Sequence, residues 1–173
     1  ALPKGRLSRL LLLPAKAVEG AERAAVLLSK LARLVTAVGL NERETGYLLS
    51  HPDAFGGPLI KLPVSDAFDE AAVTAGFRGF LRLLAYARLK NRIAGGGDRL
   101  IDVFEAARSG DEDKGYALFA ELAKADESAV KAAAQALFSD PDPSDEGQLE
   151  RLAEALKCAG RLGVPVSVLI GWM

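Results

Sequence analysis

The apolar residues of this chain recur at the three- and four-residue intervals of an α-helix over most of its length. The longest continuous pattern covers residues 67–97 and predicts one central helix, with Asp66 as its N-cap. At about 100° per residue, its large apolar positions form one wide stripe that we expect to face the core. These positions are Phe77, Phe80, Leu81, Leu84 and Ala87.

Two glycines lie inside this pattern and three follow it. Gly76 and Gly79 would each cost about 1 kcal/mol of helix propensity relative to alanine. We therefore expect another backbone to approach closely there, or the helix to bend. Residues 95–97 are all glycine and predict the end of the helix, because glycine readily adopts the left-handed C-cap geometry.

Three helices are predicted before the central one. Residues 7–13 form a short apolar helix that Pro14 stops, and residues 19–38 form a long helix that Gly39 ends. The third begins at Asn41, because Glu44 three residues later completes a capping box, and it runs to about Ser50.

The segment 51–65 contains three prolines and two glycines, which predicts a loop. It also carries several apolar side chains, so we expect it to lie across the domain. These are Leu59, Ile60, Leu62 and Val64.

Four further periodic segments each follow an expected N-cap residue. The expected caps are Asp98, Asp111, Asp126 and either Ser144 or Asp145. Gly163 ends the last long helix, in which Leu149, Leu152, Leu156, Ala159 and Leu162 are expected inward, and Pro165 begins a short helix through Trp172.

No segment shows sustained alternation of apolar and polar residues, so we expect no sheet. The predicted fold class is all-α: an irregular bundle of about eight to nine helices in a single domain over residues 1–173, with possible halves at 1–65 and 66–173. The chain starts with Ala1 and stops in an apolar segment at Trp172-Met173, so we expect a piece of a longer polypeptide.

A pattern recurs at both ends of the chain. A long helix, a glycine turn with an apolar residue after it, and a short helix occur at 31–49 and again at 155–172. Gly39 aligns with Gly163, and Leu40 aligns with Val164. We therefore predict a repeated unit in which the apolar residue packs back on its long helix.

Composition limits the possible partners. Half of the residues are hydrophobic, only 6% are aromatic, and the formal net charge is −1, so no overall field attracts nucleic acid or an acidic membrane. The apolar run 10–15 follows Lys4, Arg6 and Arg9 as in a signal peptide, but it is too short for one, and far shorter than the roughly 20 residues of a membrane span.

The residues that could carry chemistry lack the partners that chemistry needs. His51, the only histidine, has no metal-ligand or nucleophile spacing around it and is expected to contact carbonyls at a helix end. Cys158, the only cysteine, is expected to be a small buried residue. The run Gly95–Gly97 with Asp98 lacks the spacing of a phosphate loop. A group of acidic residues near position 142 resembles a calcium loop but lacks its central glycine, so we expect it to be a solvated turn. That set is Asp140, Asp142, Asp145 and Glu146.

Cations give the middle of the chain a local positive bias. Either they form a solvated helix surface or they face a partner. The candidate partner face consists of Arg78, Arg82, Arg88, Lys90 and Arg92.

Three stretches resemble the helical shell of Tc toxin A subunits and of related large virulence-plasmid A-type proteins with neuraminidase-like regions. They are GLNERETGYLLSHPDAFGG at 39–57, FRGFLRLLAYARLKNRIAGGGDRLIDVFEAAR at 77–108 and GRLGVPVSVLIGW at 160–172. The resemblance implies a secreted, pentameric assembly that binds target cells and delivers a toxic partner through a channel. It carries over no catalytic residues, and 173 residues hold neither the channel nor the receptor modules.

The sequence therefore predicts a non-enzymatic helical scaffold or docking module, with no cofactor and no metal, whose partners are other domains or subunits of a large secreted toxin assembly. No nucleic acid and no membrane insertion by this segment are expected. The alternative is a free-standing interaction domain with a groove for a partner peptide or helix. An unrecognised enzyme is the third possibility.

Overall fold

The computed structural model describes residues 15–59, 62–63, 69–93 and 96–171. All regular structure in these residues is helical, which confirms the all-α prediction. The helix predicted at 7–13 lies outside the described residues. The elements are α2 (Ala15–Val38), α3 (Glu42–Ser50), a 3₁₀ turn η1 (Ala54–Gly56), α4 (Glu70–Arg92), α5 (Gly96–Arg108), α6 (Glu112–Ala123), α7 (Glu127–Leu137), α8 (Glu146–Leu162) and α9 (Val166–Ile170).

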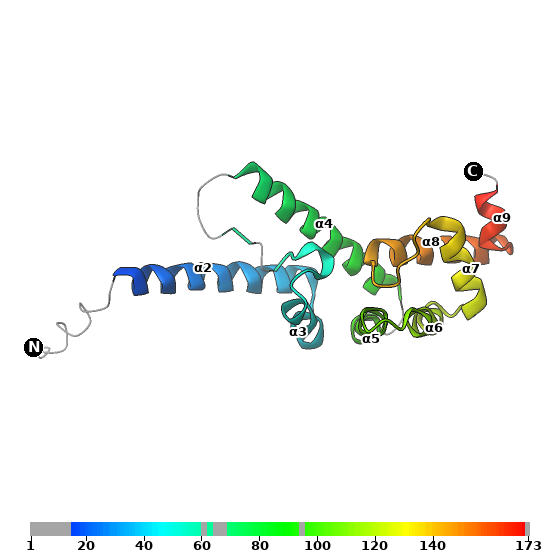
Figure 1. The fold of residues 1–173 in the computed structure, drawn as a ribbon, viewed down its shortest axis with the longest axis horizontal. Helices are drawn as coiled ribbons and strands as arrows, with labels where there is room; N and C mark the ends of the chain where they lie inside the picture. Colours follow the sequence, from blue (N-terminus) through cyan, green and yellow to red (C-terminus); the bar gives the residue numbers. More distant parts are fainter. Residues whose placement is uncertain (1–14, 60–61, 64–68, 94–95, 172–173) are drawn as a thin grey trace, which may run out of the picture.

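The helices are arranged along one axis rather than around a single centre (Figure 1). At one end, α2 extends as an arm, and the first half of α4 diverges from it. At the other end, α5 packs on α6, α8 packs on α4, and α7 packs on α6, α8 and α9. The core therefore lies on the α3–α9 side of the molecule, and α2 reaches away from it.

Four of the predicted N-caps are confirmed. Asn41 accepts a hydrogen bond from the backbone N–H of Glu44, whose carboxylate accepts one from the Asn41 N–H at 2.6 Å, so the capping box is complete. Aspartates cap the later helices in the same way, and Asp145, not Ser144, caps α8. The other two are Asp111 on α6 and Asp126 on α7.

The predicted boundaries of the central helix are wrong at both ends. Its cap is Asp69, which accepts from the N–H groups of Ala71 and Ala72, and Asp66 lies outside the described residues. The helix ends at Arg92, because Ile93 is extended. The last two glycines, and Asp98 after them, form the first turn of α5 instead of a cap before it.

The predicted core stripe of α4 is also wrong. Phe77 is 59% exposed, and Phe80 and Leu81 are exposed as well. The buried face carries Gly79, Leu83, Tyr86 and Leu89 instead. Periodicity alone gave no reason to choose this face, because its first member is a glycine with no side chain.

Gly79 is where the loop after α3 crosses the helix. A Cβ there would lie 3.2 Å from the carbonyl oxygen of Gly56 and 3.4 Å from Pro58, so the predicted close approach of another backbone is confirmed. The loop buries Leu59, as expected, and also Phe55. Leu62 is half-buried, and Ile60 and Val64 lie outside the described residues.

Phe55 has a left-handed backbone, with φ at 51°. Its ring lies 4.9 Å from that of Tyr86 and 5.3 Å from that of Phe104. The left-handed conformation costs a non-glycine residue about 1–2 kcal/mol, and burying the ring offsets it with about 2–3 kcal/mol. The aromatic ring thus fixes the loop against α4 and α5.

The repeated turn is confirmed at the level of its geometry. Gly39 and Gly163 have φ of 69° and 67°. The next residue donates its N–H back to the helix in both, from Leu40 to Val35 at 2.9 Å and from Val164 to Ala159 at 3.1 Å. The match is incomplete further back, because Leu162 is 56% exposed, contrary to prediction.

The same turn ends α6, but there the left-handed position holds Lys124, with φ at 53°. The following N–H, that of Ala125, donates to Ala120 at 3.0 Å. A lysine in this position bears the steric cost that glycine avoids at Gly39 and Gly163.

We expect Lys124→Gly to raise the free energy of unfolding by about 1 kcal/mol in urea denaturation, because it relieves this cost. Gly39→Ala is the matched opposite: nothing lies within 4 Å of the added Cβ, so only backbone strain acts. That variant should lose about 1 kcal/mol. Equal stability of the Lys124→Gly variant and the parent would contradict the assignment.

Candidate interaction site

Three of the five cations predicted to face a partner are held in ion pairs inside the chain. Arg82 binds Glu146 with two guanidinium hydrogen bonds, one of them at 2.7 Å. Lys90 donates to the carboxylate of Glu44 at 2.7 Å and to the carbonyl of Gly39 at 2.6 Å. Arg92 lies 2.6 Å from Glu154.

The remaining two, Arg78 and Arg88, are exposed and form no ion pair with another described residue. They are ten residues apart, so about 15 Å of helix separates them. The structure thus does not gather the five cations on one free face. Their role toward a partner remains a prediction.

Glu146 was expected in a solvated turn, but it is buried against Arg82. Burial raises the pKa of the Glu146 carboxyl, and the Arg82 guanidinium opposes that shift. The hydrogen bond to Glu146 raises the pKa of Arg82 in turn. The pair ties α4 to α8, with Asp145 3.6 Å from the same guanidinium.

Arg82→Met should leave the Glu146 carboxylate buried without its counter-charge. We expect a loss of about 2 kcal/mol at pH 7, below the cost for a fully buried pair because Arg82 is 42% exposed. The folded-state pKa of Glu146 is raised, so the loss should shrink toward pH 4, where the carboxyl is protonated, and grow as the pH rises.

The measurement is urea denaturation at both pH values. Arg78→Met, one turn earlier on α4, is the control and should show no such pH-dependent difference. A loss of equal size at pH 4 and pH 7 would contradict the role of Glu146.

A second buried carboxylate joins three helices. Glu44 of α3 is fully buried. It accepts hydrogen bonds from the Tyr86 hydroxyl and Lys90 on α4, in addition to the N–H of Asn41. Burial first, and the neighbouring Glu44 second, raise the pKa of Tyr86 well above its ordinary value.

The third helix contacts Glu44 through Gly97, in the first turn of α5. A Cβ at Gly97 would lie 2.0 Å from the Glu44 Oε1 atom, so only glycine fits. Next to it, Asp98 accepts a hydrogen bond from the Asn41 side chain at 2.7 Å. This explains why glycines begin α5, a reason that helix-stop rules cannot reveal.

Gly97→Ala should therefore displace the Glu44 carboxylate and lower the free energy of unfolding by about 2–3 kcal/mol. Gly160→Ala, in α8, is the control, because nothing lies within 4 Å of its Cβ. It should gain up to about 1 kcal/mol of helix propensity. Thermal and urea denaturation compare the two, and a neutral Gly97→Ala variant would contradict this account.

The prediction for His51 is confirmed, and the prediction that Cys158 is buried is wrong. The His51 ring nitrogen Nδ1 lies 3.0 Å from the carbonyl of Tyr47 at the end of α3, as expected. Cys158 is exposed, not buried, because it lies one position away from the buried Ala159. In the described part of the chain, no three His, Cys, Asp or Glu side chains are grouped as a metal site.

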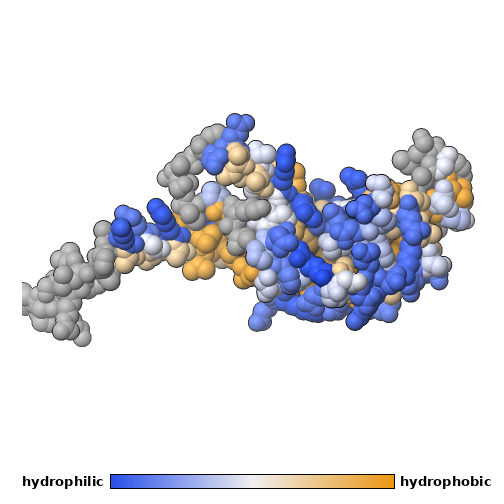
Figure 2. Space-filling model, in the orientation of Figure 1, coloured by the Kyte–Doolittle hydropathy of each residue, from blue (hydrophilic) through white to orange (hydrophobic). Residues whose placement is uncertain are grey.

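An exposed apolar surface lies on parts of α2 and α4 in the described residues, at positions that the sequence had not distinguished. On α2 the exposed large residues are Val18, Val26 and Leu28, the last at 66%. On the first half of α4 they are Val73, Phe77, Phe80 and Leu81. Figure 2 shows apolar atoms gathered on the middle of the α2 arm.

No protein-family model matches the chain, and no curated protein and no solved structure matches it. Among the described helices, none combines the length and the apolar character that crossing a bilayer requires. The described residues define an all-α protein that buries its apolar side chains at one end and exposes several of them on α2 and α4 at the other.

Proposed function

We propose that the chain is a non-enzymatic docking module whose α2 arm and first half of α4 pack against other helices of a larger assembly. The observation that carries this proposal is the burial of α2. None of its residues from Lys16 to Val38 is buried, although Leu27, Leu31, Leu34 and Val35 form a regular apolar stripe.

A helix in this situation lacks the packing that usually stabilises helices. Isolated helices are marginal in water, and in proteins most of their stability comes from burying an apolar face. Leu31, Leu34 and Val35 are half-buried against the core cluster, whereas every residue of 16–26 is exposed. In this proposal a partner protein packs against the rest of α2 and buries its apolar side chains.

The shape of the exposed surface supports a helical partner. The apolar residues of α2 recur at helical intervals, which is the pattern that another helix covers by interdigitation. A second set of exposed apolar residues lies on α4, where Phe77 and Leu81 are one turn apart and both exposed. Figure 1 shows that α2 and the first half of α4 diverge, so each can present its apolar face to a different helix of the assembly.

We further propose that this assembly is a secreted Tc-toxin-like A component, in which the module forms part of the helical shell. The support for this step is the resemblance of the stretches 39–57, 77–108 and 160–172, together with the uncovered helices. In such an assembly the module has a structural role, because it packs against other parts of the shell, and the toxic activity belongs to a partner protein.

The test adds a charge to the apolar face of α2 in the longer gene product that contains this chain. Leu28→Glu should prevent assembly, measured as the yield of the large oligomer in size-exclusion chromatography and electron microscopy. Ser29→Glu, at the next position and also exposed, is the control and should assemble normally. In the isolated chain neither variant should change stability by more than about 0.5 kcal/mol.

Two results would overturn the proposal. One is equal assembly of the Leu28→Glu and Ser29→Glu variants. The other is a gene product that proves to be a short, monomeric cytoplasmic protein.

A further inference from the structure

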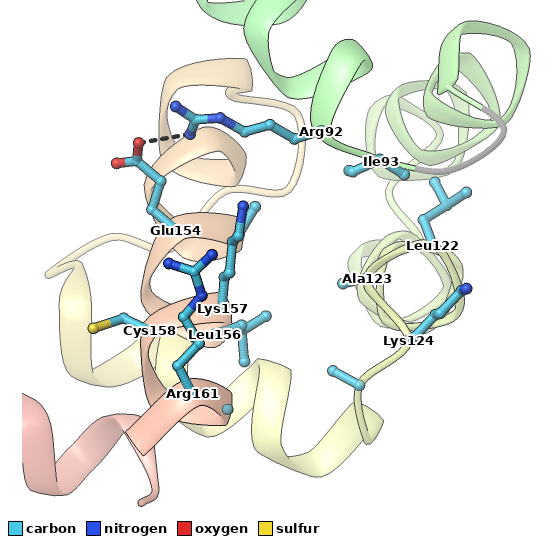
Figure 3. A pocket seen from close by; sticks show the side chains of 13 residues that line it. Arg92, Ile93, Leu122, Ala123, Lys124, Glu154, Leu156, Lys157, Cys158 and Arg161 are labelled. Atoms are coloured by element: carbon cyan, nitrogen blue, oxygen red, sulfur yellow. Dashed lines mark ion pairs between the residues drawn. The ribbon is translucent and has the colours of Figure 1, made fainter. Parts of the chain in front are cut away.

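A groove lies at the opposite end of the molecule from the α2 arm, between α8 and the C-terminal end of α6 (Figure 3). The end of α4 closes it on one side, and α7 packs on both α6 and α8. Its volume is about 780 Å³, and it is open to solvent along one side. Its floor is apolar and consists of Ile93, Leu122, Ala123, Ala153 and Leu156.

The rim of the groove is positive. It carries four cations, Arg92, Lys124, Lys157 and Arg161, and one carboxylate, Glu154, which gives a net charge of 4 − 1 = +3. Arg92 is paired with Glu154, whereas the other three cations form no ion pair with a described residue. The whole chain has a net charge of −1, so this positive rim is a local feature.

Helix ends explain only part of this charge. Lys124 and Arg161 lie at the C-terminal ends of α6 and α8, where a cation gains about 0.3–1 kcal/mol from the helix dipole. Lys157 lies more than one turn before the end of α8, beyond the reach of that effect. The helix dipole also gives no reason for an apolar floor between the cations.

We propose that this groove binds an acidic amphipathic helix of a partner protein. The wall that α8 provides runs from Ala153 to Arg161, about 12 Å or two helical turns. Apolar side chains of the partner at i and i+4 would contact Leu156 and Ile93, and its flanking carboxylates would meet Lys157 and Arg161.

Other occupants fit these features less well. The segment 1–14 of this chain carries Lys4, Arg6 and Arg9 and no acidic residue, so its charge has the same sign as that of the rim and is repelled by it. A small organic anion is usually enclosed over most of its surface, which a groove open along one side does not provide. The inference does not depend on the proposed toxin assembly.

The test uses the chain labelled with an environment-sensitive fluorophore at Cys158. This single cysteine is exposed at the edge of the groove and belongs to its lining, and its side chain points away from Leu156 on the floor (Figure 3). The probes are helical peptides of about 14 residues with leucine at i, i+4 and i+7. One carries glutamate at the other positions and one carries lysine, and polyglutamate of equal length lacks the apolar face.

The glutamate–leucine peptide should bind about tenfold or more tightly than either of the others, and its affinity should fall as salt rises. The double variant Lys157→Glu with Arg161→Glu should lose that preference by about tenfold or more. The matched control is Arg23→Glu with Arg33→Glu on α2, which makes the same change in net charge at two exposed positions.

Three results would overturn the proposal. Equal affinity for the glutamate–leucine and lysine–leucine peptides would show that the cations of the rim do not contribute to binding. Equal affinity for polyglutamate and the glutamate–leucine peptide would show that the apolar floor does not contribute. Equal losses in the two double variants would reduce the effect to net charge. Self-association that the Lys157→Glu, Arg161→Glu variant abolishes would identify a second copy of the chain as the occupant.

Discussion

The buried carboxylate of Glu44 is the constraint on which the arrangement of this chain depends. It completes the cap of α3, accepts from Tyr86 and Lys90 on α4, and fills the space beside Gly97 that a side chain on α5 would need. A buried charge is costly unless it is paired and hydrogen-bonded. Here a helix cap, a lysine and a tyrosine satisfy it together, and these contacts hold α3, α4 and α5 at one junction.

From this junction the two ends of the molecule differ in how they bury their apolar residues. On one side, Leu100, Phe104, Phe119, Val130 and Leu149 are almost completely buried, and the Arg82–Glu146 pair fixes α8 against α4. On the other side, α2 has half-buried and exposed residues only. The described residues thus bury their apolar side chains at one end and leave those of α2 exposed or half-buried at the other, which is the arrangement that the proposed docking role requires.

Local sequence signals predicted the parts of the fold that local chemistry controls. Aspartate and asparagine caps, the capping box at Asn41, and the left-handed glycines Gly39 and Gly163 depend on residues within one or two turns, and they were found in their predicted places. Of the two alternatives predicted for Gly76 and Gly79, a close approach of another backbone or a bend, the first is found at Gly79.

The predictions that were wrong concern features that contacts between distant residues control. The buried face of α4 is set by the loop that crosses Gly79, and the start of α5 is set by the carboxylate of Glu44, more than fifty positions earlier. The groove between α6 and α8 could not be read from the sequence, because its cations belong to three helices that only the fold brings together. The exposure of the apolar face of α2 could not be read from the sequence either, since periodicity reports an apolar face but not what covers it.

Hydrogen exchange of the backbone amides in the isolated chain tests the central claim most directly, because it reports helix by helix where stability resides. The account predicts that amides of α5 and α8 exchange only through global unfolding, whereas those in the first half of α2 exchange within a factor of about a hundred of an unstructured peptide. Protection of α2 equal to that of α5 would contradict it, since the arm would then be stable without a partner.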